Sequence, residues 1–278
     1  MSERTTKGCL IIIGGHEDKE GERAILNAVA QRVQGGKLVV TTVASHHPEG
    51  YFESYLKGFE GLGVGELVEL DIRERAEAMS PHTVEVLENA AGVFFTGGDQ
   101  LRIASQIGDT PVYQRMKHIF ECGGVVAGTS AGASAMSETM LVGSANGGVY
   151  RVGDLTMAPG LALMPSAIID QHFAERGRIG RLLGAVSMNP RLLGIGLDED
   201  TALIVEGDCC EVIGSGGVYV VDASEVSWSN VSEDRPERTL SLFDVRLHLL
   251  GSGDRFDMGD RRPERCGADP VAEARAAA

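Results

Sequence analysis

Residues 124–134 read GVVAGTSAGAS, and this stretch decides the fold. Its apolar start, 124–127, is typical of a buried strand, and a helix is predicted over 133–140. Between them, residues 128–132 match G-x-S-x-G, the sharp strand-to-helix turn that lifts a serine hydroxyl above the edge of a sheet. Ser130 is therefore a candidate nucleophile and the N–H of Ala131 a candidate oxyanion donor. The alternative is a serine that only caps a helix.

Short apolar runs alternate with amphipathic stretches along the chain. The predicted strands are 9–13, 37–43, 65–70 and 92–96, and the predicted helices are 18–34, 48–62 and 113–121, with a further helix starting at Ser80-Pro81. This alternation predicts an α/β fold with a mainly parallel sheet flanked by helices on both faces. Later runs, 194–197, 202–205, 210–213 and 218–221, predict antiparallel strands toward the C-terminus. These strands either close the far edge of the sheet or form a second, smaller sheet.

Length and charge limit the possible functions. The 278 residues fit one α/β domain over residues 1–250, followed by a tail over 251–278 that we expect to be mobile. A net charge of −15 argues against nucleic acid and anionic membranes as partners. Five cysteines without C-x-x-C spacing argue against a disulfide framework or a zinc site and favour a reducing, cytoplasmic compartment. No targeting or transmembrane segment, metal or cofactor is expected.

A serine nucleophile needs a general base. His172 is the leading candidate because it follows a predicted strand end, where ligand sites of open sheets lie. Its neighbours in the sequence are polar groups suited to recognising carboxylates and guanidinium groups: Asp170, Gln171, Arg176, Arg178 and Arg181. The alternative bases His16, His46 and His47 also follow predicted strands.

A second glycine turn, TGGDQ at residues 96–100, ends another predicted strand and faces the same edge as Ser130. Its glycine N–H groups are candidates for the second oxyanion donor, and Gln100 for binding a substrate amide or carboxylate. The turn lacks the spacing of a phosphate-binding loop, so nucleotide binding is not expected.

Seven motifs in order resemble the cyanophycinase family of serine peptidases, which also holds aspartyl dipeptidase and is related in fold to class I glutamine amidotransferases. The motifs are GGHEDK (14–19), ASHHPEGYFESY (44–55), FTGGDQ (95–100), GTSAGAS (128–134), APGL (158–161), DQHFAERGRIGRL (170–182) and GIGLDEDTAL (194–203). The resemblance runs from about residue 8 to about residue 250. The elbow carries serine where a glutamine amidotransferase would carry cysteine, which disfavours that activity.

The resemblance implies an exopeptidase that cuts the poly-aspartate backbone of cyanophycin and releases β-aspartyl-arginine, without a cofactor and as a homodimer. In it, Ser130 attacks the carbonyl, His172 transfers the proton, and the N–H groups of Gly98 and Ala131 hold the oxyanion. The implied β-Asp-Arg pocket comprises Gln100, Asp170, Gln171, Arg178 and Arg181.

One feature departs from the family. The family places a carboxylate 15 to 18 residues after the nucleophile to orient the histidine, whereas residues 145–148 read ANGG. We expect Asp154 to serve from a shifted loop, with Asn146 as a weaker substitute. The departure leaves open a non-catalytic binding homologue with a degenerate triad. A peptidase of the aspartyl dipeptidase type is a separate alternative.

Overall fold

The computed structural model describes residues 8–144, 151, 153–233 and 238–264. The first half of the chain forms β1 Cys9–Ile13, α1 Ala24–Val33, β2 Lys37–Thr41, α2 Tyr51–Gly58, β3 Glu66–Leu70, α3 Arg75–Ala78, α4 Pro81–Glu85, β4 Ala90–Phe95, α5 Gln100–Ile107, α6 Pro111–Glu121 and β5 Val125–Thr129. The second half forms α7 Ala131–Ser134, β6 Thr139–Ser144, β7 Leu155–Pro159, β8 Ala167–Asp170, α8 Ile179–Met188, β9 Leu193–Leu197, β10 Thr201–Glu206, β11 Cys209–Gly214, β12 Val218–Asp222, β13 Trp228–Ser229, β14 Leu242–Phe243, β15 Arg246–Leu250, β16 Arg255–Asp257 and β17 Arg262–Glu264.

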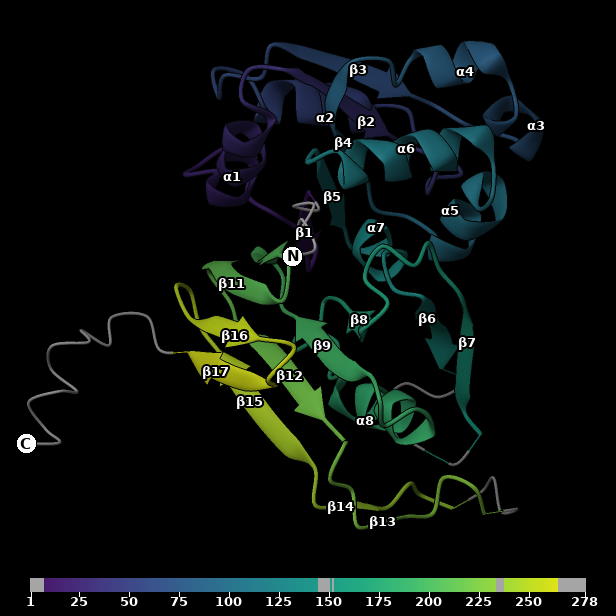
Figure 1. Ribbon diagram of the computed structural model, residues 1–278, viewed down its shortest axis with the longest axis vertical. Helices are drawn as coiled ribbons and strands as arrows, with labels where there is room; N and C mark the ends of the chain where they lie inside the picture. The colour runs from purple at the N-terminus through teal and green to yellow at the C-terminus, as the bar shows by residue number, and fades with distance from the viewer. Residues whose placement is uncertain (1–7, 145–150, 152, 234–237, 265–278) are drawn as a thin grey trace, which may run out of the picture.

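Two sheets organise the molecule (Figure 1). The larger has nine strands in the order β17-β16-β11-β10-β1-β5-β4-β2-β3, and its β1, β5, β4, β2 and β3 are parallel. The smaller has the order β15-β12-β9-β8, with β8 and β9 parallel and the other neighbours antiparallel. The predicted α/β class is confirmed. Both alternatives for the late strands occur, because β10 and β11 extend the large sheet while β9 and β12 lie in the small one.

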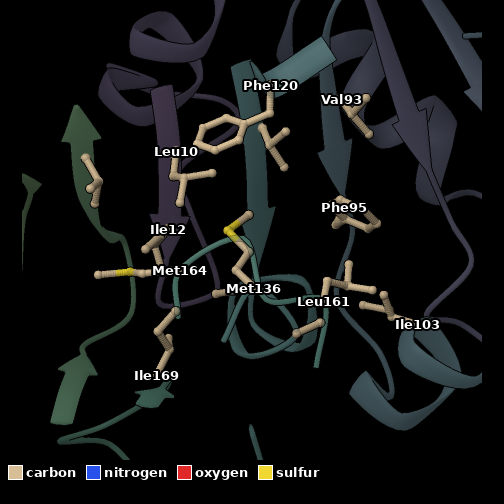
Figure 2. Close-up of a cluster of buried hydrophobic side chains, with 14 of the residues drawn as sticks. Leu10, Ile12, Val93, Phe95, Ile103, Phe120, Met136, Leu161, Met164 and Ile169 are labelled. Atoms are coloured by element: carbon tan, nitrogen blue, oxygen red, sulfur yellow. The ribbon is translucent and has the colours of Figure 1, made fainter. Parts of the chain in front are cut away.

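The large sheet is buried on both faces. In β1, Ile11 and Ile13 face a cluster that includes α1 and α2, whereas Leu10 and Ile12 face one that includes α5 and α6. Figure 2 shows the second cluster, in which Leu10 lies beside Phe120 and Ile12 beside Met164. Strands covered on both faces read as continuous apolar runs, which explains the sequence CLIII in β1.

The second core cluster joins the two sheets. It contains Val126 of the large sheet together with Ile169 of β8 and Ile195 of β9. The opposite face of the small sheet packs against α8, where Leu182 and Val186 are fully buried. The carboxyl ends of β8 and β9 are thereby fixed beside those of β1 and β5.

Two predicted elements are corrected. The helix expected over 133–140 is the four-residue α7, because Thr139 already begins β6, which pairs with β7 in a hairpin. The tail expected from residue 251 includes β16 and β17, which join the large sheet through β11. Phe256 in β16 is 1% exposed, so the ordered domain continues past residue 250; residues 265–278 lie outside the described chain.

In the described part of the chain, no helix combines the length and the apolar character that a membrane span requires.

Candidate active site

The turn after β5 holds Ser130 in an unusual backbone conformation, φ 52° and ψ −108°. Its N–H donates to the carbonyl oxygen of Ile13 at 3.0 Å, which ties the turn to the end of β1. The flanking glycines are required by close packing: a Cβ on Gly128 would lie 2.7 Å from the backbone of Gly132, and one on Gly132 would lie 2.6 Å from Phe95. The G-x-S-x-G spacing is therefore a steric requirement of this turn.

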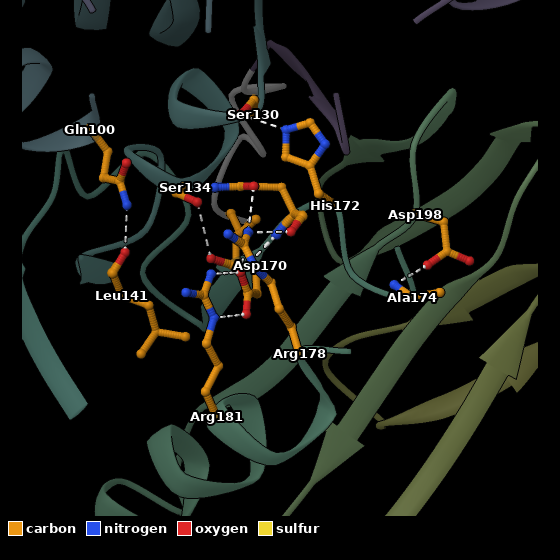
Figure 3. A network of polar contacts seen from close by, with 12 residues as sticks. Gln100, Ser130, Ser134, Leu141, Asp170, His172, Ala174, Arg178, Arg181 and Asp198 are labelled. Carbon is orange, nitrogen blue, oxygen red and sulfur yellow. Dashed lines mark hydrogen bonds and ion pairs between the residues drawn. The ribbon is translucent and has the colours of Figure 1, made fainter. Parts of the chain in front are cut away.

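Ser130 faces His172, as predicted (Figure 3). The Oγ of Ser130 lies 2.9 Å from Nε2 of His172, although the two residues are 42 positions apart in the chain. His172 follows β8, and its N–H donates to the carbonyl oxygen of Gly14 at 2.9 Å. The imidazole is thus held where it can accept the hydroxyl proton.

The other ring nitrogen meets a carboxylate that we did not predict. Nδ1 of His172 lies 2.6 Å from Oε1 of Glu199, which follows β9. This contact fixes the tautomer: Nδ1–H donates to the carboxylate, and Nε2 is left to accept from Ser130. The expectation that Asp154 orients the histidine is corrected, because Glu199 occupies that position. Asp154 instead precedes β7, and Asn146 lies outside the described residues.

His172 is 3% exposed, and this burial lowers its pKa below the ordinary value of a histidine. The hydrogen bond that His172 donates to Glu199 opposes the shift, and the positive charge of Arg176 adds to it. Since burial is the largest cause, the neutral imidazole is favoured. Neutral imidazole is the form that a general base requires.

Ser130 and His172 open into a cleft of about 460 Å³. Its lining comprises His16, Glu17, Lys19, Tyr51, Tyr55, Gly97, Gly98, Thr129, Ser130 and His172. The residues come from turns at the carboxyl ends of β1, β4, β5 and β8 and from α2. This is where α/β sheets bind ligands.

Gly98 lies on this cleft, as predicted, with φ 147°. A Cβ at this position would lie 2.3 Å from the carbonyl oxygen of Ala44, so only glycine fits. Ala131 begins α7 and is fully buried behind the turn.

Asp170 does not face the cleft. Its carboxylate is 0% exposed and receives Arg181 at both oxygens, with Nε at 2.6 Å, and Arg178 at 3.3 Å (Figure 3). Arg178 also donates to Oε1 of Gln171 at 2.6 Å. The predicted contact of Asp170 with a substrate guanidinium is corrected, because both carboxylate oxygens are already paired within the protein. The network instead supports the segment that carries His172.

The remaining predicted residues are placed as follows. Gln100 begins α5 and donates from Nε2 to the carbonyl oxygen of Leu141 at 2.7 Å. Arg176 is exposed, near enough to His172 to influence its charge. His46 and His47 are exposed after β2 and are not among the residues lining the cleft.

Sequence reasoning missed Glu199. The signal was present, because Glu199 follows an apolar run just as His172 does, and β8 and β9 are parallel neighbours. Finding it required pairing these two strands, which spacing along the chain does not reveal.

His16, His172 and Glu199 offer ligand atoms within 4.8 Å of one another, a set that suits a metal ion. His172 and Glu199 already form the histidine–carboxylate pair. A metal bound there would replace their hydrogen bond, and His172 could no longer serve as the base for Ser130. What the distances define is a histidine–carboxylate pair beside the serine hydroxyl.

The fold and the site together define a class. An activated serine at a strand–turn–helix, hydrogen-bonded to a histidine that a carboxylate orients, is the arrangement of serine hydrolases.

Comparison with known proteins identifies the family. Residues 10–213 match Peptidase family S51, and the chain belongs to this family of serine-type peptidases. It is 39% identical to a cyanophycinase of Nostoc sp. over 93% of this chain and 88% of that protein. It is 36% identical to a cyanophycinase of Geminocystis herdmanii, covering 92% and 96% of the two proteins. The crystal structure of a peptidase from an acI-B1 Actinobacterium shares the fold, with a TM-score of 0.63 and 23% identity over 87% of this chain and 97% of that one.

Proposed function

We propose that this protein is an exopeptidase that hydrolyses the poly-aspartate backbone of cyanophycin and releases β-aspartyl-arginine. The triad Ser130–His172–Glu199 carries the proposal. Oγ of Ser130 lies 2.9 Å from Nε2 of His172, and Nδ1 of His172 lies 2.6 Å from Oε1 of Glu199. The relatives named cyanophycinase, similar along nearly the whole sequence, support the choice of substrate.

In the proposed mechanism, Ser130 Oγ attacks the scissile carbonyl while its proton passes to Nε2 of His172. Glu199 stabilises the imidazolium that forms. The N–H groups of Gly98 and Ala131 stabilise the oxyanion, and His172 returns the proton to the leaving amine. Water, activated by the same histidine, then hydrolyses the acyl-enzyme and restores Ser130.

Gln100 and Arg176 remain proposed substrate contacts, whereas Arg178 pairs with Asp170 and Gln171. Gln171 and Arg181, which are 5% and 8% exposed, act through the buried network that holds His172 in place.

The test is incubation with cyanophycin and detection of β-aspartyl-arginine by mass spectrometry, with Ser130→Ala as the matched control. Wild type is expected to release the dipeptide, and the variant to lose about 10⁶-fold in rate, the scale of removing the nucleophile of a triad. Equal release by both proteins would refute the assignment of Ser130.

A peptidase of the aspartyl dipeptidase type is the second candidate. It predicts cleavage of free Asp-X dipeptides and no attack on the polymer, so the same assay with both substrates separates the two. A non-catalytic homologue is disfavoured because Glu199, 2.6 Å from Nδ1 of His172, supplies the orienting carboxylate.

We also propose that the protein works in the cytoplasm as a homodimer. The cysteines Cys9, Cys122, Cys209 and Cys210 are free thiols, which suits a reducing compartment. Light scattering after gel filtration tests the dimer, and a mass equal to that of one protomer would exclude it.

A further inference from the structure

One wall of the cleft carries a lysine held in a fixed position. Nζ of Lys19 lies 3.0 Å from Oε1 of Glu17 and 4.7 Å from the centre of the Tyr55 ring. The Lys19 side chain is 27% exposed, and it lines the same cleft as Ser130 and Gly98. The ammonium group is therefore positioned before any ligand arrives.

Glu17 serves as an internal anchor for this lysine. Its side chain is 1% exposed, its Oε1 accepts from the hydroxyl of Tyr55 at 2.6 Å, and its Oε2 accepts from Oγ1 of Thr129 at 2.6 Å. Thr129 directly precedes Ser130, so the anchor is built onto the nucleophile turn. Because the Glu17 carboxylate is enclosed by donors of the protein, it is unavailable to a ligand.

The Lys19 ammonium has donors to spare. An ammonium group carries three N–H bonds, and Glu17 receives one. Tyr55 offers its ring face, which attracts the cation without accepting a conventional hydrogen bond. The remaining donors are available to an anionic group in the cleft.

Two neighbouring arginines are committed elsewhere, and the exposed Arg176 is not among the residues that line the cleft. Arg181 and Arg178 pair with the buried Asp170. Among the residues that line the cleft in the described part of the protein, Lys19 alone carries a fixed positive charge. A carboxylate entering beside Ser130 would therefore meet Lys19.

We propose that Lys19 binds a carboxylate of the substrate and thereby sets specificity for peptides that carry a free acid beside the scissile bond. The inference rests on the proposed function. Cyanophycin offers this group in two places: the carboxyl terminus of its backbone and the α-carboxylate of the arginine branch. The chemistry of recognition, an ammonium–carboxylate pair, is the same for both.

The experiment uses a two-unit cyanophycin fragment in three forms: the free acid, the fragment amidated at the carboxyl terminus of its backbone, and the fragment with arginine amides on the branches. Wild type, Lys19→Met and Lys19→Arg are compared by KM and kcat. Lys117→Met is the matched control, because Lys117 also pairs with a glutamate, Glu121 at 3.8 Å, but on α6.

Lys19→Met is expected to raise KM for the free acid by about 10- to 100-fold with a smaller change in kcat, which is the loss of one charge-assisted hydrogen bond. The amide that lacks the recognised carboxylate should bind wild type and Lys19→Met equally, and this identifies the source. Lys19→Arg should recover part of the affinity, and Lys117→Met should match wild type.

The inference is overturned if Lys19→Met leaves KM for the free acid unchanged, or raises it equally for all three forms, since the effect would then not depend on a carboxylate. Thermal melting confirms that the variants are folded. Absence of hydrolysis by wild type on every form and on the polymer would instead overturn the proposed function itself, and this inference with it.

Discussion

At the residue scale, the site depends on three side chains from separate elements. Ser130 follows β5, His172 follows β8 and Glu199 follows β9. Each covers one requirement of acyl transfer: a nucleophile, a base and a group that orients the base. His16 adds an exposed imidazole whose Nδ1 lies 3.6 Å from Oε2 of Glu199, with its ring edge-on to His172.

Replacing Glu199 tests which carboxylate orients the histidine. Glu199→Gln keeps the size of the side chain but removes its charge, so the imidazolium is less stable and kcat is expected to fall by about 10²–10⁴-fold. Asp154→Asn is the matched comparison and should keep the wild-type kcat. A loss of activity in Asp154→Asn alone would show that our assignment of the carboxylate is wrong.

The pH dependence follows from the burial of His172. Because burial lowers the pKa of His172, the base stays neutral to a lower pH, and kcat/KM should rise through a pKa below the ordinary 6.5. Arg176 also lowers this pKa, so Arg176→Ala should move the acidic limb to higher pH. A pH profile of kcat/KM measures both; a limb that does not move, or moves to lower pH, would contradict the prediction.

At the element scale, the Gly14-Gly15 turn after β1 fixes the segments that follow β8 and β9 at the site. The carbonyl oxygen of Gly14 accepts from the N–H of His172, and that of Gly15 accepts from the N–H of Asp200 at 2.8 Å. Gly15 has φ 112°, and a Cβ there would lie 2.3 Å from the His172 ring. The turn therefore fixes the position of the His172 imidazole as well as continuing the chain after β1.

Gly15→Ala is expected to displace His172 and lower kcat by at least about 10²-fold, the scale of losing the general base. The matched control is Gly61→Ala, since Gly61 also has a positive φ, 75°, but nothing lies within 4 Å of its Cβ position. Both changes should cost about 1 kcal/mol of backbone strain in urea unfolding. Equal kcat in the two variants would argue against the steric role of Gly15.

At the scale of the whole molecule, the peptidase domain extends into the segment predicted as a tail. Arg255–Asp257 pairs with β11, and the Phe256 ring lies 5.5 Å from that of His248, centre to centre. Phe256 belongs to the core cluster shared by both sheets. This late segment therefore contributes to the stability of the core that positions β8 and β9.

Truncation at two positions tests which part of the C-terminal segment stabilises the fold. A protein ending at Glu264 should match the stability of the full-length protein, because it keeps every described strand. A protein ending at Leu250 loses Phe256 and should be destabilised by about 3–5 kcal/mol, the cost of removing a buried phenylalanine. Urea unfolding measures both, and equal midpoints would show that β16 contributes nothing to stability.

The sequence was sufficient where chemistry follows from neighbouring residues. The G-x-S-x-G turn, the apolar strands and the position of His172 after a strand are local patterns, and the structure has them as predicted. The same reasoning failed for Asp170, since adjacency in DQHF suggested a shared cleft. A residue at the end of a strand can point into the core, and Asp170 does.

By itself, the sequence determined the α/β architecture, the nucleophile turn and the histidine, because periodicity and steric demands act over a few residues. Only the tertiary structure decided which carboxylate reaches that histidine. Glu199 lies beside His172 because β8 and β9 pair in parallel. Strand pairing is a contact between segments distant in the sequence, so local spacing does not encode it.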